Sequence, residues 1–492
     1  MGLLIKGGII VDGTKRKPFK GNLLVREGKI IALGNVPDYG IKETVEANDL
    51  FIAPGFIDPD SSSDFLFSLI NHRQQENYLK QGVTTVVLGH GGISLAPIFG
   101  WPENILDNWT GEGINLNWNT FLEMEKGLKN CQFGVNFCSL AGYSSIRDSI
   151  ADFKEEKDLT ENETKVFLKI IKESIEEGAL GISFGFGYSY SPSIPPKEFQ
   201  EAINEASKKE VIISLREQEW EEKKRRKIIT SFLQEFRKRG KRGKIIISQA
   251  REEDISWLKR GKNIKDVYSI INPLGFKIVP AYSFFPEWFK INDLNRMRKK
   301  LEDSEIAKRI KKKFPDLKNF SEIKILKSHF NHFMEGINLE NLRKKKRKTK
   351  KELFLELLEK SGLRTILLMK EKEVEKEILE EETVLISALI NSKETGETFK
   401  SFLKNSLEKG VSVEKTINKI TKLPAEVLGI KDRGELREEK YADLVLFDKK
   451  GEIKKVFIRG EKVFSDNKKI MKMNGKIIIN QEEKQKKKKW DF

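Results

Sequence analysis

The chain has 492 residues, of which 38% are hydrophobic and 31 are phenylalanine. This length suits a barrel of about 250 or more residues with a smaller companion domain. No stretch approaches the roughly 18 apolar residues that cross a bilayer, and the first residues lack the charged and apolar regions of a signal peptide. The two cysteines, Cys131 and Cys138, are too few for a disulfide framework. We therefore expect a cytoplasmic protein.

The formal net charge is +17, from 91 basic and 74 acidic residues. Basic residues occur in many segments, and the three densest runs are Lys223–Lys227, Arg343–Lys351 and Lys484–Lys489. Such runs are usually solvated helix faces or tails, and no recognisable nucleic-acid-binding module accompanies them. We therefore expect neither a nucleic acid nor a membrane as a partner, and a basic scaffold that binds polyanions is the weakest alternative.

Both ends of the chain consist of short apolar runs separated by glycine turns. Residues 1–50 and 426–480 each contain several such runs, for example Leu23–Val25 and Leu444–Phe447. This pattern is typical of hairpin strands. It predicts one small β domain assembled from both chain termini, followed by a basic tail over residues 481–492.

Between these ends, residues 51–425 alternate strand-like apolar runs with helical patterns. One helix is clearly marked, because Thr160 and Glu163 form a capping box and Gly178 follows the apolar stripe. A charged helical insertion is predicted near residues 290–375. The predicted strands are residues 51–58, 83–88, 135–140, 179–183, 211–215, 244–248, 276–279 and 383–387. Eight strands with intervening helices predict an α/β fold, a TIM-type (β/α)8 barrel whose active site lies at the carboxyl ends of the strands.

Six segments, in order along nearly the whole chain, have the character of family motifs: Leu4–Gly13, Ala53–Asp58, Gln81–Thr85, Glu177–Ser183, Leu423–Ile430 and Asp432–Leu436. Together they resemble the amidohydrolase superfamily and, within it, the N-acyl-D-amino-acid deacylase (D-aminoacylase) family. The resemblance implies a barrel enzyme that hydrolyses linear amide C–N bonds with the help of zinc. Zinc serves this chemistry by lowering the pKa of a bound water from about 15.7 to about 7.

The residues at the metal-binding positions of the family include no nitrogen or sulfur ligand. The first strand of the family ends in His-x-His, whereas this chain has Asp60 and Ser62 there, two residues apart and so on one face of a strand. The positions of one cysteine, two histidines and the catalytic aspartate are held by Gly91, Ser214, Gln249 and Ala388, and two further family positions are held by Tyr143 and Gly187. The resemblance with these substitutions predicts a zinc-free homologue that uses no cofactor.

Three other polar residues at strand ends are candidates for ligand binding. They are Arg216, Tyr188 and Arg147. An arginine at the mouth of a barrel can hold a carboxylate through two parallel hydrogen bonds, so we predict a small carboxylate ligand. The alternative for Arg216 is a structural ion pair with Glu217 or Glu219.

A remodelled, oxygen-rich metal site is a second possibility. It would draw on residues from different strand ends, which are Asp60, Asp64, His90, Glu217 and Glu219. Carboxylate ligands favour magnesium or manganese over zinc. Such a site would make the chain an active amidohydrolase.

Our leading expectation is a catalytically degenerate, D-aminoacylase-like pseudoenzyme that retains ligand or partner binding. Its partner would be a second copy of the chain or an active relative. The active amidohydrolase with a carboxylate-based metal site is the alternative.

Overall fold

The computed structural model describes residues 2–36, 41, 43–64, 68–99, 118–151, 158–188, 194–218, 221–238, 243–261, 266–291, 294–314, 317, 320–328, 331–466 and 472–479. The predicted basic tail and Glu219 lie outside these residues. Within the described ranges, no helix has both the length and the apolar character that a membrane span requires.

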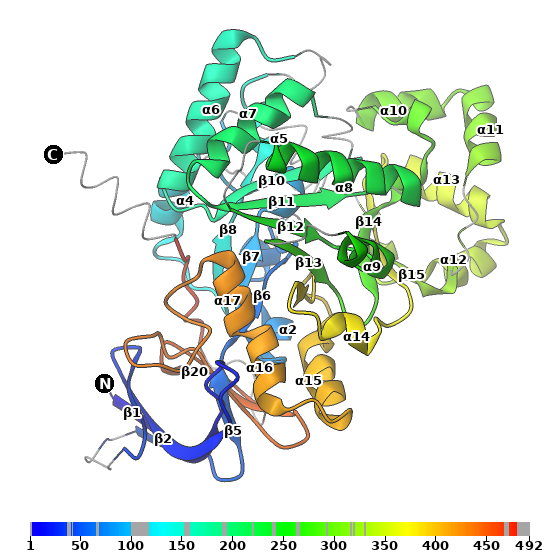
Figure 1. The fold of residues 1–492 in the computed structure, drawn as a ribbon. Coiled ribbons are helices and arrows are strands. Elements are labelled where there is room, and N and C mark those ends of the chain that lie inside the picture. The colour runs from blue at the N-terminus through cyan, green and yellow to red at the C-terminus, as the bar shows by residue number, and fades with distance from the viewer. Residues whose placement is uncertain are drawn as a thin grey trace.

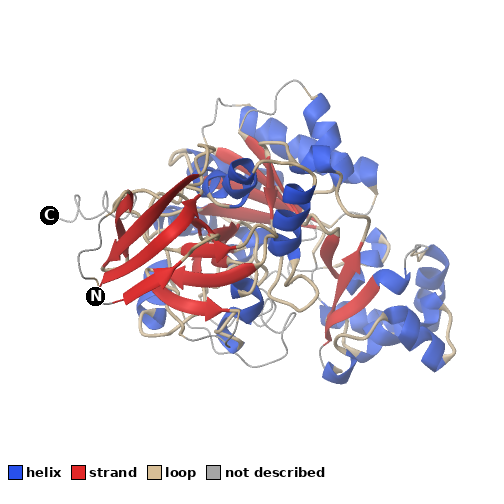
Figure 2. Ribbon diagram, turned by 90° about the horizontal axis from the view of Figure 1, so that it is seen from below, coloured by secondary structure: helices blue, strands red, loops and turns tan. Residues whose placement is uncertain are grey.

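The two ends of the chain meet in one eight-stranded sheet (Figure 2). Its order is β20-β19-β18-β5-β1-β2-β3, and β4 pairs with β1. The turn between β2 and β3 has positive φ at both central residues, Glu27 and Gly28, as a tight two-residue hairpin requires. Strands β18 and β5 pair antiparallel, with Val445 opposite Ala53, and so join the C-terminal strands to the N-terminal ones. The strands are β1 (Gly2–Ile10), β2 (Phe19–Arg26), β3 (Lys29–Gly34), β4 (Glu43–Glu46), β5 (Phe51–Pro54), β18 (Leu444–Phe447), β19 (Ile453–Ile458) and β20 (Glu461–Ser465).

The middle of the chain forms the predicted TIM-type barrel, with helices on its outside (Figure 1). Neighbouring strands pair in parallel in two runs, β6-β7-β8 and β9-β10-β11-β12-β13-β17. Strands β8 and β9 follow one another and share the third position. The barrel strands are β6 (Phe56–Asp58), β7 (Val83–Leu88), β8 (Asn136–Ser139), β9 (Ala141–Gly142), β10 (Gly181–Phe186), β11 (Ile212–Glu217), β12 (Lys244–Ser248), β13 (Val267–Ile271) and β17 (Val384–Ile386).

The helices around the barrel bury one apolar face each. In α6, the capping box of Thr160 and Glu163 is present, and Phe167 and Ile171 are buried. These helices are α1 (Ser68–Asn71), α2 (Glu76–Leu79), α4 (Phe121–Leu128), α5 (Tyr143–Asp148), α6 (Glu161–Glu176), α7 (Pro196–Ser207), α8 (Glu222–Arg237), α9 (Glu252–Arg260), α14 (Lys376–Leu379), α15 (Thr398–Glu408), α16 (Val413–Ile420) and α17 (Lys422–Leu428).

The seventh barrel strand differs from the predicted one. We expected residues 276–279, but β13 (Val267–Ile271) takes this place, between β12 and β17. The polar residues Tyr268 and Ser269 interrupt the apolar run of β13, so its sequence is a weak strand signal. The segment at 276–279 belongs to β14 (Phe276–Pro280), which pairs antiparallel with β16 (Thr365–Lys370) outside the barrel.

The insertion is a separate layer of sheet and helices, which we call the insertion subdomain (residues 276–370). Its three-stranded sheet, in the order β14-β16-β15, was not expected, because we predicted helices alone. Figures 1 and 2 place this subdomain and the terminal β domain on opposite sides of the barrel. It has its own apolar core, which includes Phe284, Ile310 and Phe354. Its other elements are α10 (Leu294–Leu301), α11 (Ser304–Lys313), β15 (Ile323–Ser328), α12 (Leu339–Lys346) and α13 (Lys350–Lys360).

Candidate functional site

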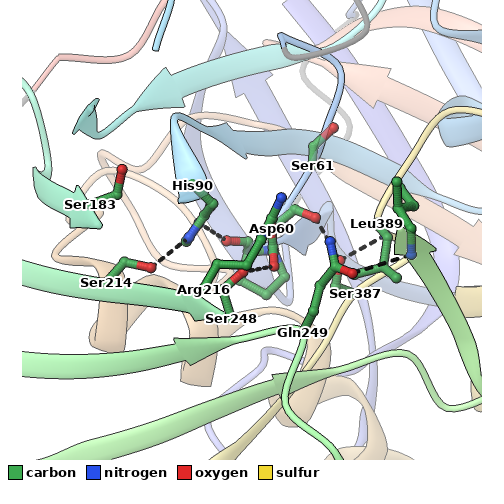
Figure 3. A network of polar contacts seen from close by, with 12 residues as sticks. Asp60, Ser61, His90, Ser183, Ser214, Arg216, Ser248, Gln249, Ser387 and Leu389 are labelled. Carbon is green, nitrogen blue, oxygen red and sulfur yellow. Dashed lines mark hydrogen bonds and ion pairs between the residues drawn. The ribbon is translucent and has the colours of Figure 1, made fainter. Parts of the chain in front are cut away.

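A buried ion pair lies where the first, fifth and sixth barrel strands end. Asp60 follows β6, and one of its carboxylate oxygens, Oδ1, accepts a hydrogen bond from the guanidinium of Arg216 on β11. Ser248, the last residue of β12, donates to Oδ2 of Asp60 over 2.5 Å and accepts from Nε of Arg216 over 2.8 Å. Figure 3 shows these three side chains directed toward one another. Parallel strands of a barrel end on one face, which brings together residues far apart in the sequence.

Solvent is almost fully excluded from this network. Asp60 is 0% exposed and Arg216 is 4% exposed. A buried carboxylate and a buried guanidinium are tolerated only as a pair with further hydrogen bonds, and Ser248 supplies these to both. Arg216 therefore pairs with Asp60, a partner that the sequence did not suggest. Of the two glutamates considered above, Glu217 lies beside Arg225 and Glu219 lies outside the described residues.

Gly91 gives the Arg216 side chain its space. Gly91 lies in a loop after β7, with φ of 75°, a conformation that favours glycine. A Cβ atom at this position would lie 3.3 Å from Cδ of Arg216. A cysteine here, as in the family pattern, would require the arginine to shift.

His90, next to Gly91, has both ring nitrogens in hydrogen bonds. Nε2 lies 2.8 Å from the carbonyl oxygen of Pro59, and Nδ1 lies 2.8 Å from Oγ of Ser214. Burial lowers the pKa of His90, and the nearby Arg216 charge acts in the same direction while Asp60 opposes it. In the neutral ring Nε2 must donate, because a carbonyl oxygen can only accept, so Nδ1 accepts from Ser214. Neither nitrogen then has a lone pair available for a metal ion.

The ends of the first and eighth strands are joined by the Asp58 carboxylate and by a backbone hydrogen bond. Asp58 accepts hydrogen bonds from the amides of Asp60 and Ala388, each over 3.1 Å. Burial raises the pKa of Asp58 to about 7, although these hydrogen bonds oppose the shift. The amide of Ser62 donates to the carbonyl of Leu389 over 2.7 Å. Ser62 and Ala388, two of the family ligand positions, therefore lie at the junction of these strands.

The remaining family positions serve packing and loop contacts. The side-chain oxygen of Gln249 accepts from the amide of Ile278 over 3.2 Å, which links β12 to the insertion subdomain. The hydroxyl of Tyr143 donates to Glu198 over 2.6 Å. Gly187 follows β10 with φ of 78°. These contacts connect elements around the site.

Of the three predicted ligand-binding residues, Arg147 lies apart from Arg216 and Tyr188. Arg147, on α5, forms an ion pair of 2.8 Å with Glu198. The hydroxyl of Tyr188 accepts from Gln218 over 2.8 Å, and burial raises its pKa to about 12. Tyr188 is close enough to Arg216 for the arginine charge to act on it, whereas Arg147 belongs to the pair with Glu198.

The predicted carboxylate metal site is not assembled among the residues that the structure describes. Asp64 accepts from the amide of Gly89 over 2.6 Å, and Glu217 lies 3.7 Å from the guanidinium of Arg225. In the described ranges, no three histidine, cysteine, aspartate or glutamate side chains are grouped so that they could hold a metal ion.

Sequence reasoning missed Ser248 and Ser183. Ser248 completes the Asp60–Arg216 pair, and the hydroxyl of Ser183 on β10 donates to the carbonyl of Gly89 and accepts from the amide of Gly92, over 2.5 and 3.0 Å. Their only sequence signal is a serine at or near a predicted strand end.

A cavity of about 530 Å³ lies on the outside of the barrel, away from this network. Its lining comes largely from the segments of α14, α15 and α16, and includes Phe402, Thr416 and Lys419. Lys419 is 7% exposed, and its ammonium group donates to the carbonyl of Glu381. Burial lowers its pKa to about 7, although Glu381 and Glu382 oppose the shift.

This lysine predicts a pH dependence of stability. The ordinary pKa of 10.5 means that the unfolded chain binds the proton more tightly than the folded chain between pH 7 and 10.5. The unfolding free energy contributed by Lys419 should therefore rise with pH across this window, by up to about 1.4 kcal/mol per pH unit. Denaturation of the wild type and of Lys419→Met at pH 7 to 10 gives the difference in their unfolding free energies, which should change with pH. Lys415→Met, an exposed neighbour, is the control, and a constant difference for Lys419→Met would contradict the prediction.

Curated relatives match part of the chain. The D-aminoacylase of Alcaligenes xylosoxydans xylosoxydans is 32% identical over 190 residues, which cover 38% of each protein. The N-acyl-D-aspartate deacylase of the same organism is 30% identical over 199 residues, 40% of this chain and 39% of that enzyme. The matched regions thus span less than two fifths of the length of these relatives.

Solved structures match the fold over almost its whole extent. A D-aminoacylase structure has a TM-score of 0.76 at 20% identity and covers 97% of this chain and 99% of its own. The N-acyl-D-glutamate deacylase of Bordetella bronchiseptica, complexed with zinc and a phosphonate inhibitor, has a TM-score of 0.77 at 19% identity with the same coverage. At these identities the likeness concerns the fold.

Our expectation that no cofactor is involved is contradicted by these structures. One contains zinc, another concerns the binuclear metal centre of D-aminoacylase, and a third is a D-aminoacylase variant with copper chloride. Proteins of this fold thus bind metal ions in these structures. The expectation failed because missing nitrogen and sulfur ligands at family positions do not by themselves exclude a metal. The side chains of Asp60 and His90 do not fit such an ion, because the carboxylate oxygens of Asp60 and the ring nitrogens of His90 already take part in hydrogen bonds within the protein.

The sequence profile of the amidohydrolase family matches residues 124–463, more than half of the chain. This region contains barrel strands from β8 onward, the insertion subdomain and most of the C-terminal strands of the β domain. The barrel, the terminal β domain and the relatives agree with this match, and the chain belongs to the amidohydrolase family.

Proposed function

We propose that this protein is a catalytically degenerate member of the amidohydrolase family, related to the D-aminoacylases. The observation that carries the proposal is the buried ion pair between Asp60 and Arg216. Both charged groups lie at the strand ends, where barrel enzymes place their reacting groups, and they bind each other there.

The hydrogen bonds around the pair support this proposal. Amide hydrolysis needs a group that takes a proton from water and a group that stabilises the developing negative charge. Both carboxylate oxygens of Asp60 already accept hydrogen bonds, from Arg216 and from Ser248, so neither is directed at a water molecule. His90 holds its Nδ1 toward Ser214 and its Nε2 toward Pro59. The chemistry would require both side chains to exchange partners.

Retained binding of a small carboxylate is the second part of the proposal. A ligand carboxylate would compete with Asp60 for the Arg216 guanidinium, since both are planar anions that match its geometry. We also propose that the chain associates with a second copy of itself or with an active relative. Both would give a degenerate barrel a role without hydrolysis.

The test is an acetate-release assay with N-acetyl-D-amino acids. We expect the purified full-length protein, with and without added zinc, to release acetate at the rate of the Asp60→Asn variant. An active D-aminoacylase is the positive control, and elemental analysis gives the metal content of the same samples. Turnover that exceeds the Asp60→Asn background and follows the metal content would reject the proposal.

A further inference from the structure

The positive charge of this protein is concentrated on the insertion subdomain. Residues 276–370 contain 25 lysines and arginines against 12 aspartates and glutamates, a net formal charge of +13 out of +17 for the chain. The other residues contain 66 basic and 62 acidic residues, a net charge of +4. A general excess of lysine along the chain would charge both parts alike, so it does not explain this distribution.

Sixteen of these 25 basic residues lie on the four helices α10 to α13 of the subdomain. Figures 1 and 2 show these helices on the side of the subdomain sheet that faces away from the barrel. Basic residues fill the last turns of α10, α11 and α12, where they also interact favourably with the helix dipole. That effect does not account for the basic residues beyond these turns, such as Arg347 and Lys351. Six of the exposed basic residues on these helices are together called the basic surface: Arg298, Lys299, Lys300, Lys312, Lys313 and Lys345.

The apolar faces of these helices are already used. Leu294 and Met297 of α10, Ile310 of α11 and Leu342 of α12 are buried in the core of the subdomain. A helix that lies in a membrane surface needs an apolar face for the lipid. The solvent-facing sides of these helices are therefore charged rather than apolar. Such sides attract the phosphate groups of a polyanion electrostatically.

An exposed aromatic side chain lies beside this charge. Trp288 is 46% exposed, and the guanidinium of Arg309 on α11 lies 4.7 Å from its ring centroid. Stacked arginine and aromatic side chains are surfaces on which unpaired bases stack. Phe333, also in the subdomain, is 75% exposed.

We infer that the insertion subdomain binds single-stranded nucleic acid, with the basic surface on the phosphates and Trp288 with Arg309 on a base. This changes our expectation from the sequence, which treated the basic residues as scattered. The inference is independent of the proposed function, because the subdomain has its own core and the ion pair of Asp60 lies in the barrel.

Fluorescence anisotropy with a labelled 20-nucleotide oligouridine tests the inference. The main variant of the full chain replaces Lys299, Lys300, Lys312 and Lys313 by glutamine, which keeps helix propensity. The control variant replaces Lys126, Lys129, Lys165 and Lys449 by glutamine and so removes the same net charge. These four lysines are exposed and lie outside the insertion subdomain. Circular dichroism checks that both fold.

The main variant is expected to bind the oligonucleotide at least about tenfold more weakly than the wild type at low salt. The slope of log K against log salt should become less steep by up to about 3, because four charges are removed. The control variant should lose less than about threefold. Equal losses would overturn the inference, because they would mean that diffuse charge alone binds the oligonucleotide.

Two further outcomes decide the nature of the partner. Trp288→Ala should weaken binding by about fivefold or more without changing the salt slope, and Trp288→Phe should keep most of it. Unchanged binding by Trp288→Ala would overturn the assignment to single strands. Tighter binding to phosphatidylserine vesicles than to the oligonucleotide would likewise overturn it in favour of a membrane surface.

Discussion

Replacing Asp60 by alanine is expected to lower the free energy of unfolding by about 3–5 kcal/mol, because the Arg216 guanidinium is then buried without its counter-ion. Arg216 is 4% exposed, and the hydroxyl of Ser248, which accepts from its Nε, carries no charge that could replace that of Asp60. Urea denaturation followed by circular dichroism measures the loss.

The control for this substitution is Ser62→Ala, two residues away. The hydroxyl of Ser62 is buried and has no hydrogen-bond partner within the described residues, so its removal should be nearly neutral. The double variant Asp60→Leu with Arg216→Met removes both charges and should recover much of the loss. If Asp60→Ala cost the same with and without Arg216→Met, the two residues would not be energetically coupled, contrary to the structure.

A second large effect is expected at Arg225, whose replacement by alanine should also cost about 3–5 kcal/mol of unfolding free energy. Its side chain is 1% exposed, with Nε 2.6 Å from Oδ2 of Asp254 and a second bond of 3.1 Å to Oδ1. Glu217 and Glu253 lie within 3.7 and 3.2 Å of the same guanidinium. Without Arg225, the buried Asp254 would lose its strongest partner.

The matched control is Lys223→Ala, two residues earlier in the same basic run and exposed on α8. Surface substitutions of this kind usually change stability by less than about 0.5 kcal/mol. The same denaturation experiment compares the two variants. A similar small effect of both would show that Arg225 behaves as a solvated residue, as its sequence context suggests.

Arg225 shows where local patterns fail. A run of five basic residues predicts a solvated face, and four of these five positions fit that prediction at least in part, yet the third is among the largest fully buried side chains of the described residues. The reason is that α8 turns Arg225 toward acidic residues at the end of β11 and on α9. Nothing within the run itself specifies those partners.

The strands illustrate the same limit. Long apolar runs such as those of β7 and β11 were predicted correctly, because a strand buried on both faces leaves a clear apolar signature. The weak run of β13 was missed and the stronger one of β14 was taken for it. Whether a strand joins the barrel depends on pairing with β12 and β17, which is a long-range property.

The sequence by itself determined the fold class, the family and the strand ends at which polar residues gather, because these follow from apolar periodicity, turn residues and ordered motifs. Only the tertiary structure decided what those residues do. Asp60 and Arg216 are 156 positions apart, and their pairing depends on the closure of the barrel and on the space beside Gly91. The location of the positive charge was likewise settled by the insertion subdomain, which folds around its own core and turns its basic helices outward.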